Sequence, residues 1–524
     1  MSQTPLRFLL RRFRLRRPRL PLARRPAWTC PALRCPESCW FAPRRSGLPR
    51  VALSALAALL AGLCAGCASA PEAPPQLPAA PLTFRETPPG WTVATPADSQ
   101  PRGEWWRVFG DAELDRLEAR AQAGSTSIAL ALARLTQARA LARGATAERL
   151  PQAGLRSATT RQGGGLINAA GGDGTLITAT ADLSYELDLF GRLRGVADAA
   201  ALDAEGAAAL LHSVRLLVQA EVAQTYFKLR ALDAERAVLR AQHAAQAEAV
   251  RVAEARLRIG SIAELDLARL RAELAGGMAE GAALERQRAR LEHALAMAVG
   301  ATASEFALTE SDWPATAALP PRIPPGVPST MLGRRPDVAA SLRAIEAAQA
   351  RIGVARAAWF PAVALTGNAG TATPELASLF SLPMRAWGLG ALVALPLFDG
   401  GRRDAALEVA RAQFEAAMVA YREAVLAAVR DVEDQLAALR TLADEADAQE
   451  RAAGAAARAV TLSEARVANG LASQLELLDA RRVLLRAQRQ AVQVRAARFQ
   501  STVGLVRALG GGWQAAVTAG TGAS

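Results

Sequence analysis

The chain contains two similar stretches of sequence that lie 210 residues apart. Residues 249–274 read AVRVAEARLRIGSIAELDLARLRAEL, and residues 459–485 read AVTLSEARVANGLASQLELLDARRVLL. In each stretch a helical pattern is interrupted by a glycine, Gly260 or Gly470, and then resumes, which indicates a tight turn between two helices. A period of 210 residues is far too long for a solenoid, so the sequence predicts one duplicated helical-hairpin unit.

The positive charge of the chain is concentrated at its beginning. The net charge is +13, but residues 1–50 hold 13 arginines and a single acid, Glu37, and so account for +12 of it. The remaining residues are close to neutral. A nucleic-acid-binding surface needs its basic charge in the folded part of the chain, so this distribution argues against a nucleic-acid partner.

An export signal follows the arginine-rich segment. Residues 51–63 are apolar and uncharged, as in the core of a secretory signal, and small residues then lead to Cys67. This pattern resembles a bacterial lipoprotein signal, in which Cys67 would become the lipidated first residue. An uncleaved anchor helix is the alternative, at the short limit for a membrane span. Because the arginine-rich segment is unusually long, we expect translation to start downstream of Met1.

Residues 177–189 alternate strictly between apolar and polar side chains. This period of two predicts a strand with one apolar and one polar face. A preceding strand near residues 154–161 would complete a hairpin, and residues 362–371 and 386–397 predict a second hairpin. Strands of this kind are typical of a transmembrane β-barrel. A soluble sheet packed on helices is the alternative.

Four strands are too few to close a membrane barrel, because the smallest barrels have about eight. Open strand edges cannot be left in hydrocarbon, where no water satisfies their backbone groups. We therefore expect the chain to oligomerise and to pool its strands with those of other copies.

Two very long helices are predicted, over residues 191–259 and 403–469. The first carries a coiled-coil seam of apolar residues spaced by three and four: Leu211, Val214, Val218, Val222, Thr225, Leu229 and Leu232. Each long helix has about 68 residues, and the shorter helices of each repeat have about 24 and 39. Two short helices stacked end to end beside one long helix would form a rod of even height.

The predicted organisation has six segments, which alternate between sequence with and without a clear period. They are a signal over 1–67, a Pro-rich arm over 68–110, a first repeat over 111–310, a linker over 311–335, a second repeat over 336–510 and a disordered tail over 511–524.

Several motifs resemble the outer-membrane efflux proteins, the TolC-like outer membrane factors, and in particular their lipoprotein branch that serves resistance–nodulation–division pumps. The resemblance covers roughly residues 80–510. It rests on Trp105-Trp106, Tyr185-Glu186-Leu187-Asp188-Leu189-Phe190-Gly191, Arg334-Arg335-Pro336-Asp337-Val338, Ile352-Gly353 with Phe360-Pro361, Leu395-Pro396-Leu397-Phe398-Asp399-Gly400-Gly401, and Leu478-Asp479-Ala480-Arg481.

This resemblance implies a mainly α-helical fold with a membrane β-barrel. Three copies would form a twelve-stranded barrel in the outer membrane on top of an α-helical periplasmic tunnel, with the linkers at its equator. The implied function is that of a passive exit duct for small toxic compounds. An inner-membrane resistance–nodulation–division pump would supply the energy, through a periplasmic adaptor protein, and outer-membrane lipid would surround the barrel.

By the same resemblance, Glu476 and Asp479 match the ring of carboxylates at the periplasmic gate. They lie at i and i+3, so they share one helix face just past Gly470. Three copies would place six acids around the opening, which would favour cations. A solvated helix face with Asp479 paired to Arg482 is the alternative. The turns at Gly260 and Gly470 would contact the adaptor.

One departure concerns how the tip closes. The family usually has a tyrosine after the arginine of the tip motif, where this chain has Val467 after Arg466. In the family that tyrosine often binds an acid on the neighbouring hairpin, at the position of Asp266. Valine cannot make this hydrogen bond, so closure is expected to rest on other contacts.

No enzyme is expected. His212, His243 and His293 are scattered and lack metal-ligand spacing, and Cys64 with Cys67 closes an apolar run rather than a βα unit. No cofactor is expected other than a lipid on Cys67. Two other functions remain open: the outer-membrane duct of a type I protein secretion system, and a periplasmic coiled-coil scaffold without a pore. The predicted efflux function would include the export of heavy metals.

Overall fold

A computed structural model describes residues 83–86, 103–163, 174–311, 313, 320–323, 326, 328–379, 381 and 385–511. The chain divides into two units, Met1–Cys67 and Ala68–Ser524, and all the described residues belong to the second. The predicted signal with Cys67 and the predicted C-terminal tail beyond residue 511 therefore lie outside them.

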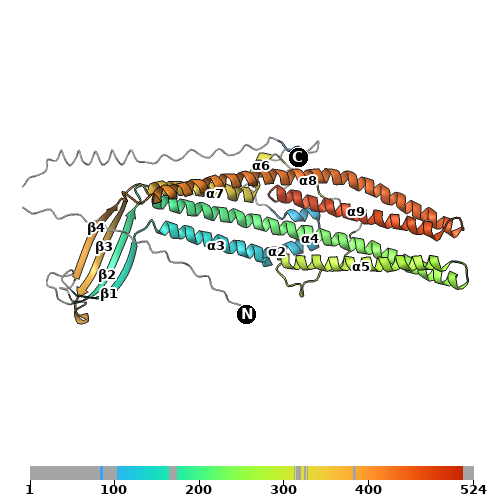
Figure 1. The fold of residues 1–524 in the computed structure, drawn as a ribbon, viewed down its shortest axis with the longest axis horizontal. Coiled ribbons are helices and arrows are strands. Elements are labelled where there is room, and N and C mark those ends of the chain that lie inside the picture. The colour runs from blue at the N-terminus through green and yellow to red at the C-terminus, as the bar shows by residue number, and fades with distance from the viewer. Residues whose placement is uncertain are drawn as a thin grey trace, which may run out of the picture. The chain divides into compact units, whose positions relative to one another are not determined.

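Two helices of 67 residues run along this unit, α4 (Arg192–Arg258) and α8 (Arg402–Ala468) (Figure 1). Their bounds agree with the prediction to within one residue. The predicted seam of α4 is also confirmed, because five of its seven residues are buried and the other two are half-buried. No helix in the described part of the chain is long and apolar enough to cross a membrane.

Shorter helices lie in pairs along the long ones: α3 (Thr126–Ala147) and α5 (Glu264–Ala298) pack on α4, and α7 (Pro336–Ala357) and α9 (Gln474–Ala508) pack on α8 (Figure 1). Their inner ends meet through backbone. A Cβ built on Gly300, which has φ +74°, would lie 2.0 Å from the carbonyl oxygen of Gly124. In the second repeat, a Cβ built on Gly510, just after α9, would lie 2.8 Å from the carbonyl oxygen of Arg334, just before α7. The end-to-end arrangement that the helix lengths predicted is therefore present in both repeats.

The segments that flank these pairs contain shorter helices. Before α3 lie η1 (Trp105–Phe109), in which both tryptophans are buried, and α2 (Ala112–Gly124). Ser125 is the N-cap residue of α3, but its side chain makes no capping hydrogen bond. The predicted linker also contains a short helix, α6 (Pro328–Arg334).

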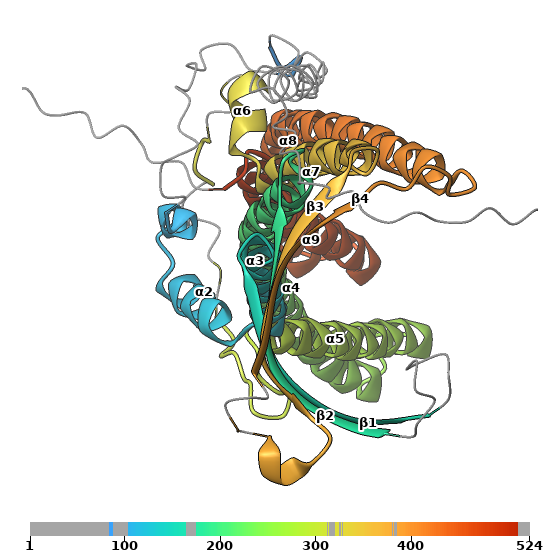
Figure 2. The same ribbon diagram turned by 90° about the vertical axis from the view of Figure 1, so that its left-hand side faces the viewer.

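Four antiparallel strands form one sheet in chain order: β1 (Gln152–Gln162), β2 (Gly174–Leu187), β3 (Ala362–Thr373) and β4 (Arg385–Ala394). A short turn of helix, η2 (Leu376–Ser378), lies between β3 and β4. The last strand ends earlier than predicted, so Leu395 and Leu397 lie beyond it. Pairing between β2 and β3 joins the two repeats, and it leaves β1 and β4 as unpaired edges of a curved sheet (Figure 2).

The sheet has one apolar face, as predicted. Residues that are paired across strands point to the same face, so the register brings apolar side chains of all four strands together: Leu155, Leu183, Leu365, Trp387, Leu389 and Val393. All six are exposed. Among the described elements no helix packs across the sheet (Figure 1), so the alternative of a sheet resting on helices is not what the structure has.

The largest hydrophobic core lies at mid-length of the long helices, where α2, α4, α8 and α9 meet. An aromatic cluster is part of it: the ring of Phe227 lies 5.0 Å from that of Phe109 and 4.8 Å from that of Phe499. The aromatic segment before α2 therefore serves packing.

Candidate functional site

The turns that join the long helices to their return helices are built alike in both repeats. Gly260 and Gly470 each have φ +72°, a left-handed conformation that glycine adopts without strain. After each glycine, a backbone N–H bonds back to the helix: Ser261 to the carbonyl of Arg256 at 2.9 Å, and Leu471 to that of Arg466 at 2.8 Å. This is the Schellman ending of a helix, and it makes both hairpin ends compact.

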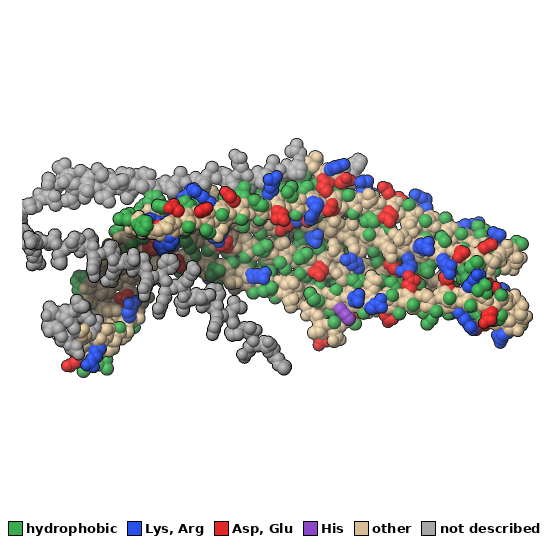
Figure 3. Space-filling view, viewed as in Figure 1, with side chains coloured by type: hydrophobic (Ala, Val, Ile, Leu, Met, Phe, Trp, Pro, Cys, Tyr) green, Lys and Arg blue, Asp and Glu red, His purple; other side chains and the backbone are tan. Residues whose placement is uncertain are grey.

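Each hairpin is also held by an equivalent ion pair near its tip. Arg271 bonds Glu254 at 2.8 Å in the first repeat, and Arg481 bonds Glu464 at 2.8 Å in the second. Charged side chains of both signs lie over the tip ends of the helices (Figure 3). These pairs brace each hairpin separately and do not connect the two.

The two carboxylates that the sequence singled out lie on the first turns of α9. Glu476 is exposed, and its backbone N–H is capped by the hydroxyl of Ser473 at 3.2 Å. Asp479 is also exposed, and it accepts a hydrogen bond at 3.2 Å from Arg482, the pairing weighed as the alternative. The guanidinium of Arg482 also contacts the other hairpin.

Arg482 connects the second hairpin to the first. Its Nε donates to both carboxylate oxygens of Glu273 on α5, at 2.8 and 2.9 Å, and this hydrogen bond raises the pKa of Arg482. One heptad further along α9, Arg489 bonds Glu280 and lies 3.5 Å from Glu235 of α4. We call this set of contacts between α9 and the first hairpin the inner seam.

The inner seam supplies the contact between the hairpins that Val467 cannot make. Val467 is half-buried, and Asp266 lies 3.9 Å from Arg269 of its own helix. The hairpins are tied instead through Arg482 and Glu273. A sequence signal existed, because arginines one heptad apart on α9 face acids one heptad apart on α5. It could not be used without knowing which helices are neighbours.

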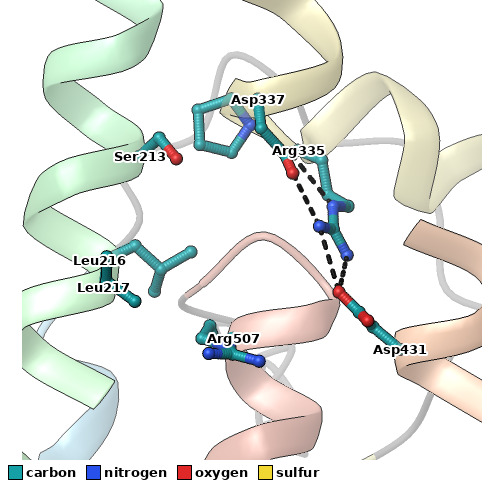
Figure 4. Close-up of a pocket in the computed structure, with 8 residues that line it drawn as sticks. Ser213, Leu216, Leu217, Arg335, Asp337, Asp431 and Arg507 are labelled. Atoms are coloured by element: carbon teal, nitrogen blue, oxygen red, sulfur yellow. Dashed lines mark hydrogen bonds and ion pairs between the residues drawn. The ribbon is translucent and has the colours of Figure 1, made fainter. Parts of the chain in front are cut away.

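A second group of ion pairs lies at mid-length of the long helices, around Arg335, the residue that caps the start of α7. Its guanidinium bonds Asp337 at 2.6 and 3.0 Å and Asp431 of α8 at 3.3 Å (Figure 4). It also donates to the carbonyl of Ala508, at the end of α9, at 3.2 Å. Burial alone would raise the pKa of Asp337, but the hydrogen bonds from Arg335 outweigh it and hold that pKa below its usual value. Arg507 lines the same cavity, of about 240 Å³.

The acid Glu118 of α2 is fully buried against the core. Neither of its carboxyl oxygens has a hydrogen-bond partner among the described residues. Burial, with a smaller contribution from Asp115, raises the pKa of Glu118 to about 9, so the carboxyl is protonated at neutral pH. Within the part of the chain that the structure covers, no three His, Cys, Asp or Glu side chains are grouped to hold a metal ion.

A duplicated helical hairpin with compact tips at one end and an open-edged amphipathic sheet at the other is the architecture of one class of protein, the outer-membrane efflux channels. The sequence profile of the outer membrane efflux proteins matches residues 117–301 and again 327–511. The chain therefore belongs to the outer membrane efflux protein family, and it is the outer-membrane component of an efflux system.

Curated relatives and solved structures agree with this assignment. The pyoverdine export outer membrane protein OpmQ of Pseudomonas putida is 33% identical over 84% of this chain and 94% of its own length. The probable outer membrane lipoprotein SilC of Salmonella typhimurium is 30% identical over 80% of this chain and 90% of its own. The structure of the outer-membrane channel OprN matches 82% of this chain and 98% of its own, with a TM-score of 0.74 and 28% identity.

Proposed function

We propose that three copies of this chain form a passive exit duct through the outer membrane, with a barrel of twelve strands and a tunnel of helices below it. The observation that carries the proposal is the four-stranded sheet, which is apolar on one face and unpaired at both edges. In lipid, the N–H and C=O groups of β1 and β4 need strand partners. Other copies of the same sheet supply them.

The internal repeat predicts how neighbouring copies meet. Within one copy, α7 covers α4, so that Ala199 and Leu216 are 3% and 7% exposed. Their counterparts on α8, 210 residues later, are Val409 and Leu426, which are 57% and 62% exposed. One face of α8 therefore lacks the covering helix that the same face of α4 has.

The helix that fits this face is α3 of the next copy, since α3 is the counterpart of α7. On α7, Ala340 and Arg351 face α4, where Arg351 bonds Asp203. Their counterparts on α3 are Leu130 and Leu141, both exposed. We therefore expect the exposed apolar residues of α3 to pack on the exposed apolar face of α8 in the neighbouring copy. The same contact, repeated from copy to copy, generates a closed ring.

At the other end, the tips form the periplasmic gate. Glu476 and Asp479 from three copies place six carboxylates at the opening, where they favour cations over anions. The turns at Gly260 and Gly470 are exposed, and they are the points that contact a periplasmic adaptor protein. The adaptor links the duct to an inner-membrane pump of the resistance–nodulation–division class, which supplies the energy for the export of small toxic compounds.

A lipid on Cys67 anchors the mature chain in the outer membrane. The apolar run that precedes Cys67 supports this step, and so does the lipoprotein relative SilC. The remaining organisation follows: an arm over 68–110, two repeats over 111–310 and 336–510, an equatorial linker over 311–335 and a tail over 511–524. Mass spectrometry of the mature N-terminus measures the lipid directly, because a diacylated and N-acylated cysteine adds a fixed mass.

The duct is tested by adding purified protein to planar lipid bilayers and recording the current. Discrete conductance steps that scale with salt concentration are expected. In cells that lack the chain, an efflux dye should accumulate, and expression of the chain should lower its level again. A protein that inserts without conducting, and whose loss leaves dye accumulation unchanged, would contradict the proposal.

A further inference from the structure

The apolar face of the sheet carries charge at one end only. This face consists of the odd-numbered residues of the four described strands, and the only charged residues among them are Arg161 on β1 and Arg385 on β4. Both arginines are exposed. Both also lie at the end of the sheet away from the helices, because β1 runs away from α3 and β4 runs towards α8 (Figure 1).

The length of the strands places this basic end at the surface of a membrane. Nine residues separate Arg161 from Gln152, the first residue of β1, and nine separate Arg385 from Ala394, the last residue of β4. At about 3.4 Å per residue and a tilt of about 40°, nine residues rise ~23 Å along a barrel axis. The apolar band of a membrane barrel is about 25 Å tall. Both guanidiniums are therefore expected among the lipid headgroups on the side away from the helices, which is the outer leaflet in the proposed channel.

The two arginines belong to the two edge strands, which meet in the assembled barrel, a step that rests on the proposed trimer. Within one copy, Ala179 of β2 lies opposite Thr371 of β3. Their counterparts in the other repeat are Trp387 of β4 and Arg161 of β1, so these two residues should lie opposite each other across the boundary between copies. Arg385 is two residues from Trp387 on the same face, which makes it the diagonal neighbour of Arg161, with about 7 Å between the Cβ atoms.

Two guanidiniums at this spacing, with no acid beside them, are suited to bind one phosphate. Neither Arg161 nor Arg385 makes an ion pair with a residue that the structure describes. A guanidinium binds two phosphate oxygens at once, and a phosphate monoester carries a charge of about −1.5 to −2 for two such cations. Trp387, which is 78% exposed, lies next to both arginines, and tryptophan is enriched at the level of lipid headgroups.

We infer that each boundary between copies binds a lipid through a phosphate monoester on its headgroup, held by Arg161 of one copy and Arg385 of the next. The glycolipid of an outer leaflet carries such phosphates. Its acyl chains lie along the apolar residues that follow on the same face, such as Leu389 of β4. Because the two arginines come from different copies, the site is incomplete in a single chain, and the bound lipid holds neighbouring copies together.

The first test measures how this lipid stabilises the assembled channel in detergent. Lipid A with two phosphates, added to the purified trimer, should raise the temperature at which the trimer dissociates by several degrees. The double variant Arg161→Gln with Arg385→Gln should lose most of this shift. Arg156→Gln is the matched control, because Arg156 lies on the opposite face of β1, and it should keep the shift. A double variant that is stabilised as strongly as the native channel would overturn the inference.

Two further additions identify the ligand. Inorganic phosphate lacks acyl chains, and phosphatidylglycerol carries a phosphodiester with a single charge. At the same phosphate concentration, each should therefore shift the dissociation temperature much less than lipid A does. A shift of equal size with either of them would overturn the assignment to a lipid with phosphate monoesters. A native protein that is never trimeric, in detergent or in membranes, would instead contradict the proposed assembly.

The second test examines the lipid that the channel carries out of the membrane. Native protein extracted from outer membranes with a mild detergent should retain the phosphorylated glycolipid, and mass spectrometry of the bound lipids measures its amount per trimer. The double variant should retain several-fold less of it, whereas Arg156→Gln should retain as much as the native protein. Equal amounts on the double variant and on the native protein would show that the two arginines do not bind the lipid.

Discussion

Phe190 stacks on Phe360, with ring centroids 4.7 Å apart and 14° between the ring planes. The pair joins the corner between β2 and α4 to the corner between α7 and β3, and so connects the two repeats. Each of these residues has a counterpart in the other repeat: Phe398 for Phe190 and Leu150 for Phe360, which are 91% and 60% exposed. In the assembled channel, Phe398 of one copy is expected to pack on Leu150 of the next.

Replacing Phe398 with serine should therefore weaken assembly without unfolding the single chain. Burying a phenylalanine side chain against a leucine contributes about 2 kcal/mol, and the contact occurs three times in the ring. Size-exclusion chromatography with light scattering in detergent measures the assembled fraction. Leu376→Ser is the matched control, because Leu376 is an exposed apolar residue between β3 and β4, away from this corner. Equal assembly of the two variants would count against the contact.

Neutralising the tip acids should change ion selectivity. In the variant Glu476→Gln with Asp479→Asn, the six carboxylates of the proposed gate are lost, so the preference for cations over anions should fall. The reversal potential in a KCl gradient across a planar bilayer measures this preference. Glu305→Gln serves as the control, because Glu305 lies in the segment after α5 and bonds Thr302. An unchanged reversal potential would place the two acids on an ordinary solvated face.

The buried carboxyl of Glu118 should make stability depend on pH. Its pKa in the folded chain is raised to about 9, above the ordinary value of 4.5. The folded state therefore holds a proton that the unfolded state has lost, and its stability is greatest below about pH 4.5 and declines as pH rises towards about 9. Glu118→Gln should remove this decline. Melting temperatures at pH 5 and pH 8.5 measure it, and parallel curves for the two proteins would contradict it.

Arg335 should be far more important for stability than its neighbour Arg507. Replacing Arg335 with alanine leaves Asp337 without its cation and leaves Asp431 with only the exposed Arg430, in a mostly buried place, which costs about 3 kcal/mol. Arg507 lines the same cavity but is exposed and makes no ion pair within the described residues. Its replacement should change stability little. Denaturant unfolding of both variants measures the difference. Equal losses in the free energy of unfolding would show that the ion pairs of Arg335 do not stabilise the fold.

Much of the fold could be predicted from the sequence because its patterns are long and local. The two long helices, the hairpin turns at Gly260 and Gly470, and the alternation of β2 each rest on a period that repeats many times. Shorter features were predicted less well. The segment 311–335 was predicted to be a linker, yet proline fits the first turn of a helix, and α6 begins at Pro328.

The candidate site was only partly predictable. The positions of Glu476 and Asp479 on α9 followed from their spacing after Gly470. The partner of Arg482 did not, because Glu273 lies 209 residues earlier in the chain and their meeting depends on how the two hairpins pack.

The pooling of strands between copies is the central claim, and one cross-link tests it most directly. Leu183 of β2 lies opposite Gly367 of β3, and their counterparts are Ala391 of β4 and Ser157 of β1. Cysteines at 157 and 391 of adjoining copies should therefore face each other at disulfide distance. Every natural cysteine lies at or before Cys67.

Oxidation of the Ser157→Cys and Ala391→Cys variant should yield chains joined covalently in threes on a denaturing gel. The control pair, Ser157→Cys with Gly390→Cys, is one residue out of register and points to opposite faces of the sheet, so it should give little product. If the first pair leaves only single chains while the protein sits in outer membranes, the strands are not shared between copies and the account is wrong.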